Sequence, residues 1–169
     1  MRRVADSIGV SATAVYRHFP DREGLLRGAA TQAIDELVAD LESTMSQEHS
    51  ARMRLEALLT DYLEAAATAP GRFRLMFGPL GAGHVGGFLD ADPLGPKPQR
   101  LFVAVAHELI ETRPDTAADA TTLATMLWAT VHGLATLMLD GPLEPSLART
   151  LAIRLAASPP LICTAPPGS

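Results

Sequence analysis

Apolar residues recur every three or four positions along most of this chain, and that spacing restricts its fold more than any other feature. The longest series is Leu25, Leu26, Ala29, Ala33, Leu37 and Leu41. Residues with this spacing lie on one face of an α-helix and can be buried together. No stretch of useful length alternates apolar and polar residues as a strand does. The sequence therefore predicts an all-α fold.

Glycine, proline and capping residues divide the chain into helices. The expected helices span residues 2–8, 12–19, 22–45, 51–69, 72–80, 98–112, 116–139 and 145–157. Many glycines and prolines predict a loop over residues 81–98. The polar stretch 46–50 is interpreted as a joint between domains spanning 1–45 and 46–157, and residues 158–169, with four prolines, are expected to form a disordered tail.

The charge of the chain is distributed unevenly. The formal net charge is −5, but residues 1–28 hold five arginines against three acidic residues and so carry +2. A basic N-terminal segment in an otherwise acidic chain can bind phosphate groups.

The compartment is predicted from what the sequence lacks. No signal peptide opens the chain, and its single cysteine cannot form an intramolecular disulfide, so we expect a cytoplasmic protein. Residues 123–139 are apolar but include His132 and several threonines, and a membrane span needs about 20 predominantly apolar residues. We therefore expect a buried or interface helix there and no contact with a membrane.

The first two expected helices form a helix-turn-helix pattern. Residues 2–8 are followed by a Gly9-Val10-Ser11 turn and a second short helix. The outward face of that helix has hydrogen-bond donors and no carboxylate, as a surface that contacts DNA requires. The alternative from pattern alone is a solvated face of a short amphipathic helix. The candidate DNA-binding residues are Ser11, Ala12, Thr13, Ala14, Tyr16, Arg17, His18 and Arg22.

Residues 2–26, RRVADSIGVSATAVYRHFPDREGLL, resemble the helix-turn-helix of the TetR family of bacterial repressors. The resemblance implies that Ser11 opens the recognition helix, that Tyr16 and His18 face the DNA backbone, and that Arg22 grips a phosphate. The family has a further helix before this motif, and the chain starts inside the motif's first helix, so we expect either that the start site is assigned too late or that this helix is missing. An alternative follows: a truncated module that binds a ligand and dimerises but cannot bind DNA alone.

The second half of the chain predicts a ligand pocket and a dimer interface. Large, adaptable Met and aromatic side chains with a few polar groups suit a small hydrophobic ligand, although ordinary core packing is the alternative for each of them. The ligand-binding candidates are Phe73, Met76, Phe77, His107, Met126, Trp128 and His132. Residues 127–139, LWATVHGLATLML, resemble a Trp…His-Gly signature of some TetR C-terminal domains. The resemblance implies a homodimer formed by the last two helices, whose candidate seam residues are Leu134, Leu137, Met138, Leu147, Leu151 and Leu155.

The sequence gives little support for an enzymatic function. The five histidines form no H-x-x-x-H pair, and GAGHVGG lacks the Lys-Ser/Thr of a phosphate-binding loop. We therefore predict no catalytic residues, no metal site and no cofactor, with an all-α enzyme as the remaining alternative. The predicted function is a ligand-responsive repressor that binds a palindromic operator of double-stranded DNA as a dimer.

Overall fold

A computed structural model describes residues 9, 11–78, 97–112 and 119–160. Every regular element in these ranges is a helix, which confirms the all-α prediction. The helices are α2 (Ala12–His18), α3 (Arg22–Ser46), α4 (Ala51–Thr68), α5 (Pro70–Phe77), α7 (Lys97–Glu111), α8 (Ala120–Leu139) and α9 (Pro145–Ala157).

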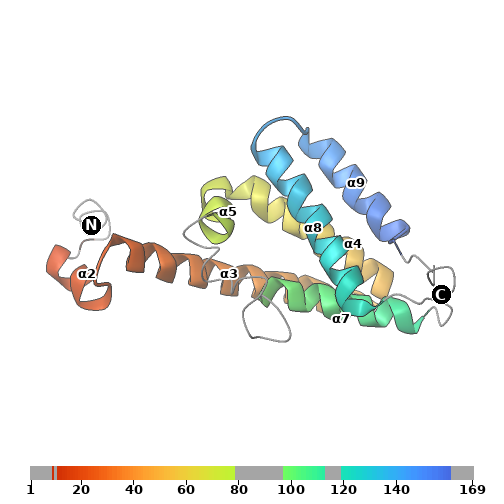
Figure 1. The fold of residues 1–169 in the computed structure, drawn as a ribbon, viewed down its shortest axis with the longest axis horizontal. Helices are drawn as coiled ribbons and strands as arrows, with labels where there is room; N and C mark the ends of the chain where they lie inside the picture. Colours follow the sequence, from red (N-terminus) through yellow and green to blue (C-terminus); the bar gives the residue numbers. More distant parts are fainter. Residues whose placement is uncertain (1–8, 10, 79–96, 113–118, 161–169) are drawn as a thin grey trace, which may run out of the picture.

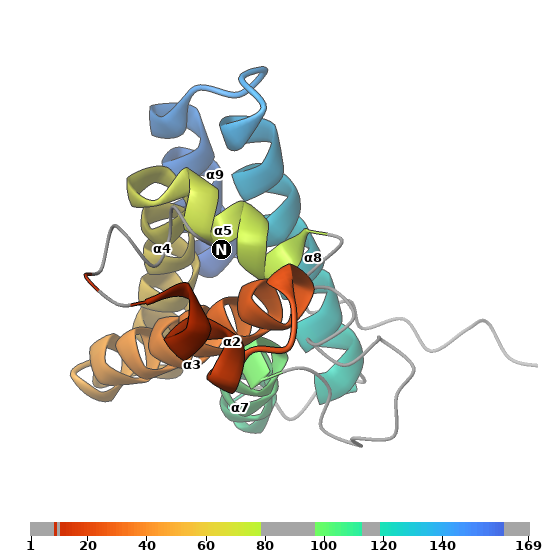
Figure 2. The same ribbon diagram turned by 90° about the vertical axis from the view of Figure 1, so that its left-hand side faces the viewer.

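The long helix α3 joins a small head to a helical bundle. Figure 1 shows α2 at one end of α3, with the remaining helices gathered around the other part of α3. Figure 2, which looks along α3, shows α2 in front of that bundle. Within the bundle, α4 is the central helix because it packs against α3, α5, α7, α8 and α9. Its buried side chains are Leu55, Leu58, Leu59, Thr60, Tyr62, Leu63 and Ala66.

Side-chain caps determine where several helices begin. Asp21 accepts a hydrogen bond from the Gly24 backbone N–H at the start of α3, and Ser50 accepts one from Met53 at the start of α4. Asp119 caps α8 in the same way, so that helix begins at Ala120 and not at the predicted residue 116. The helix predicted to begin at residue 72 begins instead at Pro70, because proline is well suited to the first helical position.

Helix α9 packs on α4 through alanines. Ala148, Ala152 and Ala156 are completely buried and lie one turn apart, so the two helix backbones can approach closely. The larger side chains of α9 face away from α4: Leu147 is 49% exposed and Leu151 is 37% exposed. On α8, Leu137 is 49% exposed as well. Among the described residues, nothing covers this apolar surface on the last two helices.

Helix α8 is long and apolar enough to cross a membrane by length and composition alone. In this fold, however, one of its faces packs against α4 and α7. The buried residues on that face are Ala120, Leu123, Ala124, Leu127, Trp128, Val131 and Ala135. One side of α8 is therefore buried in this fold and the other side is exposed.

The joint predicted at residues 46–50 lies between α3 and α4. The later turns of α3 nevertheless belong to the same hydrophobic core as α4 to α9, through Ala33, Ile34, Leu37, Leu41 and Met45. The division at residue 45 stays a prediction. The predicted first helix, most of the predicted loop at 81–98 and the tail from residue 161 lie outside the described residues.

Candidate functional site

The head is fixed to α3 by packing at one glycine. Phe19 follows α2, and its ring lies so close to Gly28 of α3 that a Cβ at Gly28 would come within 2.9 Å of it. Gly28 therefore allows the aromatic ring to rest on the helix backbone. Together with the Asp21 cap, this contact sets where α2 stands relative to α3.

The outward side of α2 is polar and open to solvent. Thr13, Tyr16, Arg17 and His18 are all exposed, and Tyr16 is 52% exposed despite its apolar ring. The helix has no acidic residue. Ser11 and Arg22, which flank α2 in sequence, are also exposed. Ala12 and Ala14 lie in the same helix, but their side chains lie outside what the structure describes.

A hydrogen-bonded cluster of three side chains lies in the bundle. The Tyr62 hydroxyl oxygen is 3.0 Å from Nδ1 of His132, and Trp128 Nε1 donates to that oxygen at 3.4 Å. Tyr62 is completely buried and Trp128 nearly so, while His132 is only partly buried. Three aromatic residues surround this cluster: Phe73, Phe77 and Phe102, with ring centroids 5.5, 6.0 and 6.3 Å from that of Tyr62.

His132 also borders a cleft between α5 and α8. The cleft has a volume of about 290 Å³. The ring of His132 stacks on Phe73, at a centroid distance of 5.7 Å, and meets Phe77 edge-on at 5.0 Å. The lining residues are Phe73, Arg74, Phe77, Gly78, His132, Thr136, Leu139 and Asp140. The fold thus brings three of the predicted ligand-binding residues to one concave surface.

The other four predicted ligand-binding residues lie elsewhere. Trp128 is buried and does not line the cleft, but it donates to the Tyr62 hydroxyl, and its ring centroid lies 6.3 Å from that of His132. His107 is exposed on α7, and Met126 is 39% exposed because α8 turns its neighbours Ala124, Leu127 and Trp128 toward the core. Tyr62, which is not among the predicted ligand-binding residues, is hydrogen-bonded to both His132 and Trp128.

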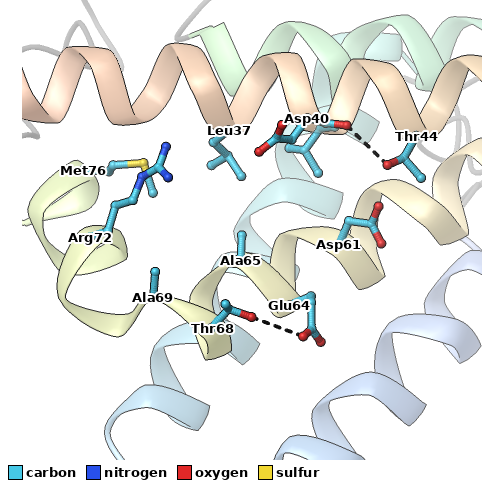
Figure 3. Close-up of a pocket in the computed structure, with 11 residues that line it drawn as sticks. Leu37, Asp40, Thr44, Asp61, Glu64, Ala65, Thr68, Ala69, Arg72 and Met76 are labelled. Atoms are coloured by element: carbon cyan, nitrogen blue, oxygen red, sulfur yellow. Dashed lines mark hydrogen bonds between the residues drawn. The ribbon is translucent and has the colours of Figure 1, made fainter.

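Met76 lines a second, larger cavity of about 420 Å³. Figure 3 shows this cavity between α3, α4 and α5, with the carboxylates of Asp40, Asp61 and Glu64 along it. Arg72 of α5 reaches α3 there, and donates to the Ala33 carbonyl at 3.2 Å and to Glu36 Oε2 at 2.6 Å. This contact ties α5, which forms one wall of the His132 cleft, to the helix that carries the head.

Comparison with known proteins identifies the family. A family model described as "Tetracyclin repressor-like, C-terminal domain" matches residues 55–157, which is more than half of the chain. The chain belongs to the TetR family. A second model, "Bacterial regulatory proteins, tetR family", matches residues 1–29 and includes α2. This TetR-family protein therefore has family-model matches over both its head and its helical bundle.

Curated relatives of this TetR-family protein include the nucleoid occlusion factors SlmA of Idiomarina loihiensis and Marinomonas sp. The first is 33% identical over 76 residues, which are 45% of this chain and 39% of that protein. The second is 29% identical over 112 residues, which are 65% and 50% of the two chains. The chain thus spans half or less of the length of these relatives.

Two solved structures from Rhodococcus share the fold. One is a protein of unknown function with a TM-score of 0.65 and 29% identity, covering 92% of this chain and 81% of that one. The other is a regulatory protein of the tetR family with a TM-score of 0.60 and 18% identity, covering 92% and 82%. The second shows likeness of fold alone.

Burial in the cleft wall lowers the pKa of His132. In the unfolded chain this histidine has its ordinary pKa of about 6.5. As the pH falls below that value, the unfolded chain takes up a proton that the folded chain still excludes, so the free energy of unfolding decreases. We expect the wild-type protein to lose more stability between pH 7.5 and 5.5 than His132→Gln, as measured by urea unfolding. An equal loss of stability in the two proteins would contradict the assignment of this pH dependence to His132.

Proposed function

We propose that this TetR-family regulator is a cytoplasmic, non-enzymatic repressor that binds a palindromic DNA operator as a homodimer and releases it when a small, largely apolar effector binds. The observation that carries the proposal is the outward side of α2, which is exposed, rich in donors and free of carboxylates. Such a side fits a major groove, where Arg can pair with guanine edges and hydroxyls can contact phosphates.

The apolar surface of α8 and α9 supports the dimer. Leu137, Leu147 and Leu151 are each more than one-third exposed, although large apolar side chains on a surface gain stability from being covered. A second copy would cover them and bring two heads together. Two identical heads related by a twofold axis match a palindromic site.

The effector response is supported by the position of α5. Phe73 and Phe77 of α5 form one wall of the His132 cleft, and Arg72 of the same short helix bonds to α3. An effector that shifts α5 would act on α3 through this contact, and α3 carries α2. The coupling thus needs no contact between the effector and the head.

We expect Arg17→Ala to weaken binding to a specific operator by about 5- to 150-fold, the range for losing one good side-chain contact to a base. Tyr16→Ala should weaken binding as well, because the tyrosine is exposed and available to a phosphate. The duplex would first be selected from random sequences with the wild-type protein. Fluorescence anisotropy would then give the affinity for that duplex and for a scrambled one, at several salt concentrations because phosphate contacts weaken with salt.

Arg52→Ala is the matched control for this experiment. Arg52 is an exposed arginine on α4 that pairs with Glu56 one turn away. Its replacement by alanine changes the net charge by the same amount as Arg17→Ala. It should leave operator affinity close to that of the wild type. Unchanged affinity in both α2 variants would rule out α2 as the DNA-contacting surface. Failure of the wild-type chain to enrich any duplex would favour the alternative of a ligand-binding and dimerising module.

A further inference from the structure

We propose that the cleft between α5 and α8 accepts a neutral, flat aromatic molecule that carries a hydrogen-bond acceptor, and that Nε2–H of His132 donates to that acceptor. The inference deepens the proposed function, since it assigns a chemical class to the effector. Three observations support it: the direction of the hydrogen bonds among Tyr62, Trp128 and His132, the aromatic residues that line the cleft, and the ion pair made by Arg74.

The hydrogen bonds of the cluster have a definite direction. The indole Nε1–H of Trp128 can only donate, so the Tyr62 oxygen accepts at 3.4 Å. Burial raises the pKa of Tyr62, so its hydroxyl keeps its proton at neutral pH. Among the residues that the structure describes, the acceptor within reach of that proton is Nδ1 of His132, at 3.0 Å. Nδ1 therefore accepts.

This direction determines the tautomer of His132. A neutral imidazole carries one N–H, and with Nδ1 accepting, the proton sits on Nε2. Within the part of the chain that the structure describes, no protein group accepts a hydrogen bond from Nε2. The ring is partly exposed and lines the cleft. Nε2–H of His132 is therefore a hydrogen-bond donor at the cleft. The buried side chains of Tyr62 and Trp128 fix the orientation of its ring.

The residues that line the cleft restrict the size and chemical class of the ligand further. Phe77 and His132, both partly buried, present ring surface to the cleft, and the buried ring of Phe73 packs against both of them. A flat ring packs favourably against such a surface. A volume of about 290 Å³ is near the lower limit for small-molecule sites, which suits a molecule of one or two rings. Arg74 donates to the Leu139 carbonyl at 2.7 Å and to Asp140 at 3.4 Å, so its charge is already offset. The acceptor is therefore a carbonyl or similar neutral group and not a carboxylate.

A matched pair of probes tests this class. 2-Acetylnaphthalene and 2-ethylnaphthalene have nearly the same shape, but only the first has a hydrogen-bond acceptor. We expect titration calorimetry with the full chain to show the ketone binding about three- to tenfold more tightly, as one net hydrogen bond implies. His132→Phe should bind both compounds with equal affinity, because it keeps an aromatic ring and removes the donor. His107→Phe, at an exposed histidine on α7, should keep the wild-type preference.

A spectroscopic measurement tests the tautomer independently of affinity. Long-range ¹H–¹⁵N spectra of histidine-labelled protein should show the Nε2–H pattern for the resonance that His132→Phe removes. Tyr62→Phe deletes the proton that Nδ1 accepts and should shift that resonance toward a mixture of tautomers. An Nδ1–H pattern in the wild type would overturn the inference.

The outcomes separate this inference from the proposed function. Equal affinity of the two probes for the wild type, a preference for the ketone that survives in His132→Phe, or no binding of either probe would overturn the inference. None of these results alters operator binding by the protein without ligand, which tests the DNA-binding role. Binding of the ketone with the expected preference but no release of the operator duplex would support the site chemistry and contradict the effector response.

Discussion

Replacing Leu137 on α8 and Leu151 on α9 with arginine is expected to convert the homodimer into monomers and to lower operator affinity at least a hundredfold. Both leucines lie on the uncovered surface of the last two helices. In a dimer, the two new charges would be buried without partners, at a cost of several kcal/mol for each. Because two linked heads bind DNA about 10²–10⁴ times more tightly than one, a monomer should lose that gain.

These two positions are chosen so that the monomer can still fold. Leu137 is 49% exposed and Leu151 is 37% exposed, so arginine at either position can extend into solvent in an isolated chain. Leu134 is more deeply placed and packs against the core, so its replacement would mix loss of folding with loss of the dimer. Light scattering would give the mass, and circular dichroism would check the helix content.

Met53→Arg is the control for an arginine introduced at an exposed apolar position on another helix, and it adds one of the two charges per chain. Met53 is 43% exposed on α4, away from the predicted seam, and its replacement should leave both the mass and the DNA affinity unchanged. A dimer that persists in the Leu137→Arg, Leu151→Arg protein would place the interface elsewhere. Monomers with full operator affinity would contradict the link between dimerisation and DNA binding.

Tyr62→Ala should lower the free energy of unfolding by about 3–5 kcal/mol, the range measured for large aromatic side chains in cores. Tyr62 is completely buried at the centre of α4, and its ring contacts three phenylalanine rings. The substitution leaves a cavity and also removes the hydrogen-bond partner of Trp128 and His132. Urea unfolding followed by circular dichroism, at one fixed protein concentration, measures the change.

Tyr62→Phe separates packing from hydrogen bonding at the same position. It keeps the ring and removes only the hydroxyl, so we expect a loss of about 1–3 kcal/mol from leaving the Trp128 donor and the His132 acceptor unpaired. If Tyr62→Ala cost no more than Tyr62→Phe, the ring would contribute little packing. The description of Tyr62 as the centre of the core would then be wrong.

The fold class and most helix boundaries could be predicted from the sequence because they depend on local properties. Helical spacing of leucines, proline at helix starts and aspartate caps act within one or two turns, and the helix over residues 145–157 was predicted at its observed ends. Where the prediction failed by a few residues, as at Ala120, a competing local signal, the Asp119 cap, sets the start. The family resemblance of the head likewise rests on one continuous segment.

The candidate ligand site could be predicted only in part. Trp128 and His132 are four residues apart on one helix, a spacing that places two side chains on the same face, and their ring centroids lie 6.3 Å apart. Residue type alone could not tell that His107 and Met126 face outward, because the orientation of a helix in a bundle depends on its neighbours. Nor could it show that Met76 and Phe73, three residues apart on α5, line two different cavities.

By itself, the sequence determined the helices, the polar side of the head helix and the membership of the TetR family, because these depend on residues close together in the chain. Only the tertiary structure decided which apolar residues of each helix are buried and which stay exposed. It brought Tyr62 to His132 across 70 positions and turned the alanines of α9 toward α4 while leaving its leucines exposed. The physical reason is that a hydrogen bond or a helix contact forms between surfaces in space, and packing of the whole bundle selects which surfaces meet.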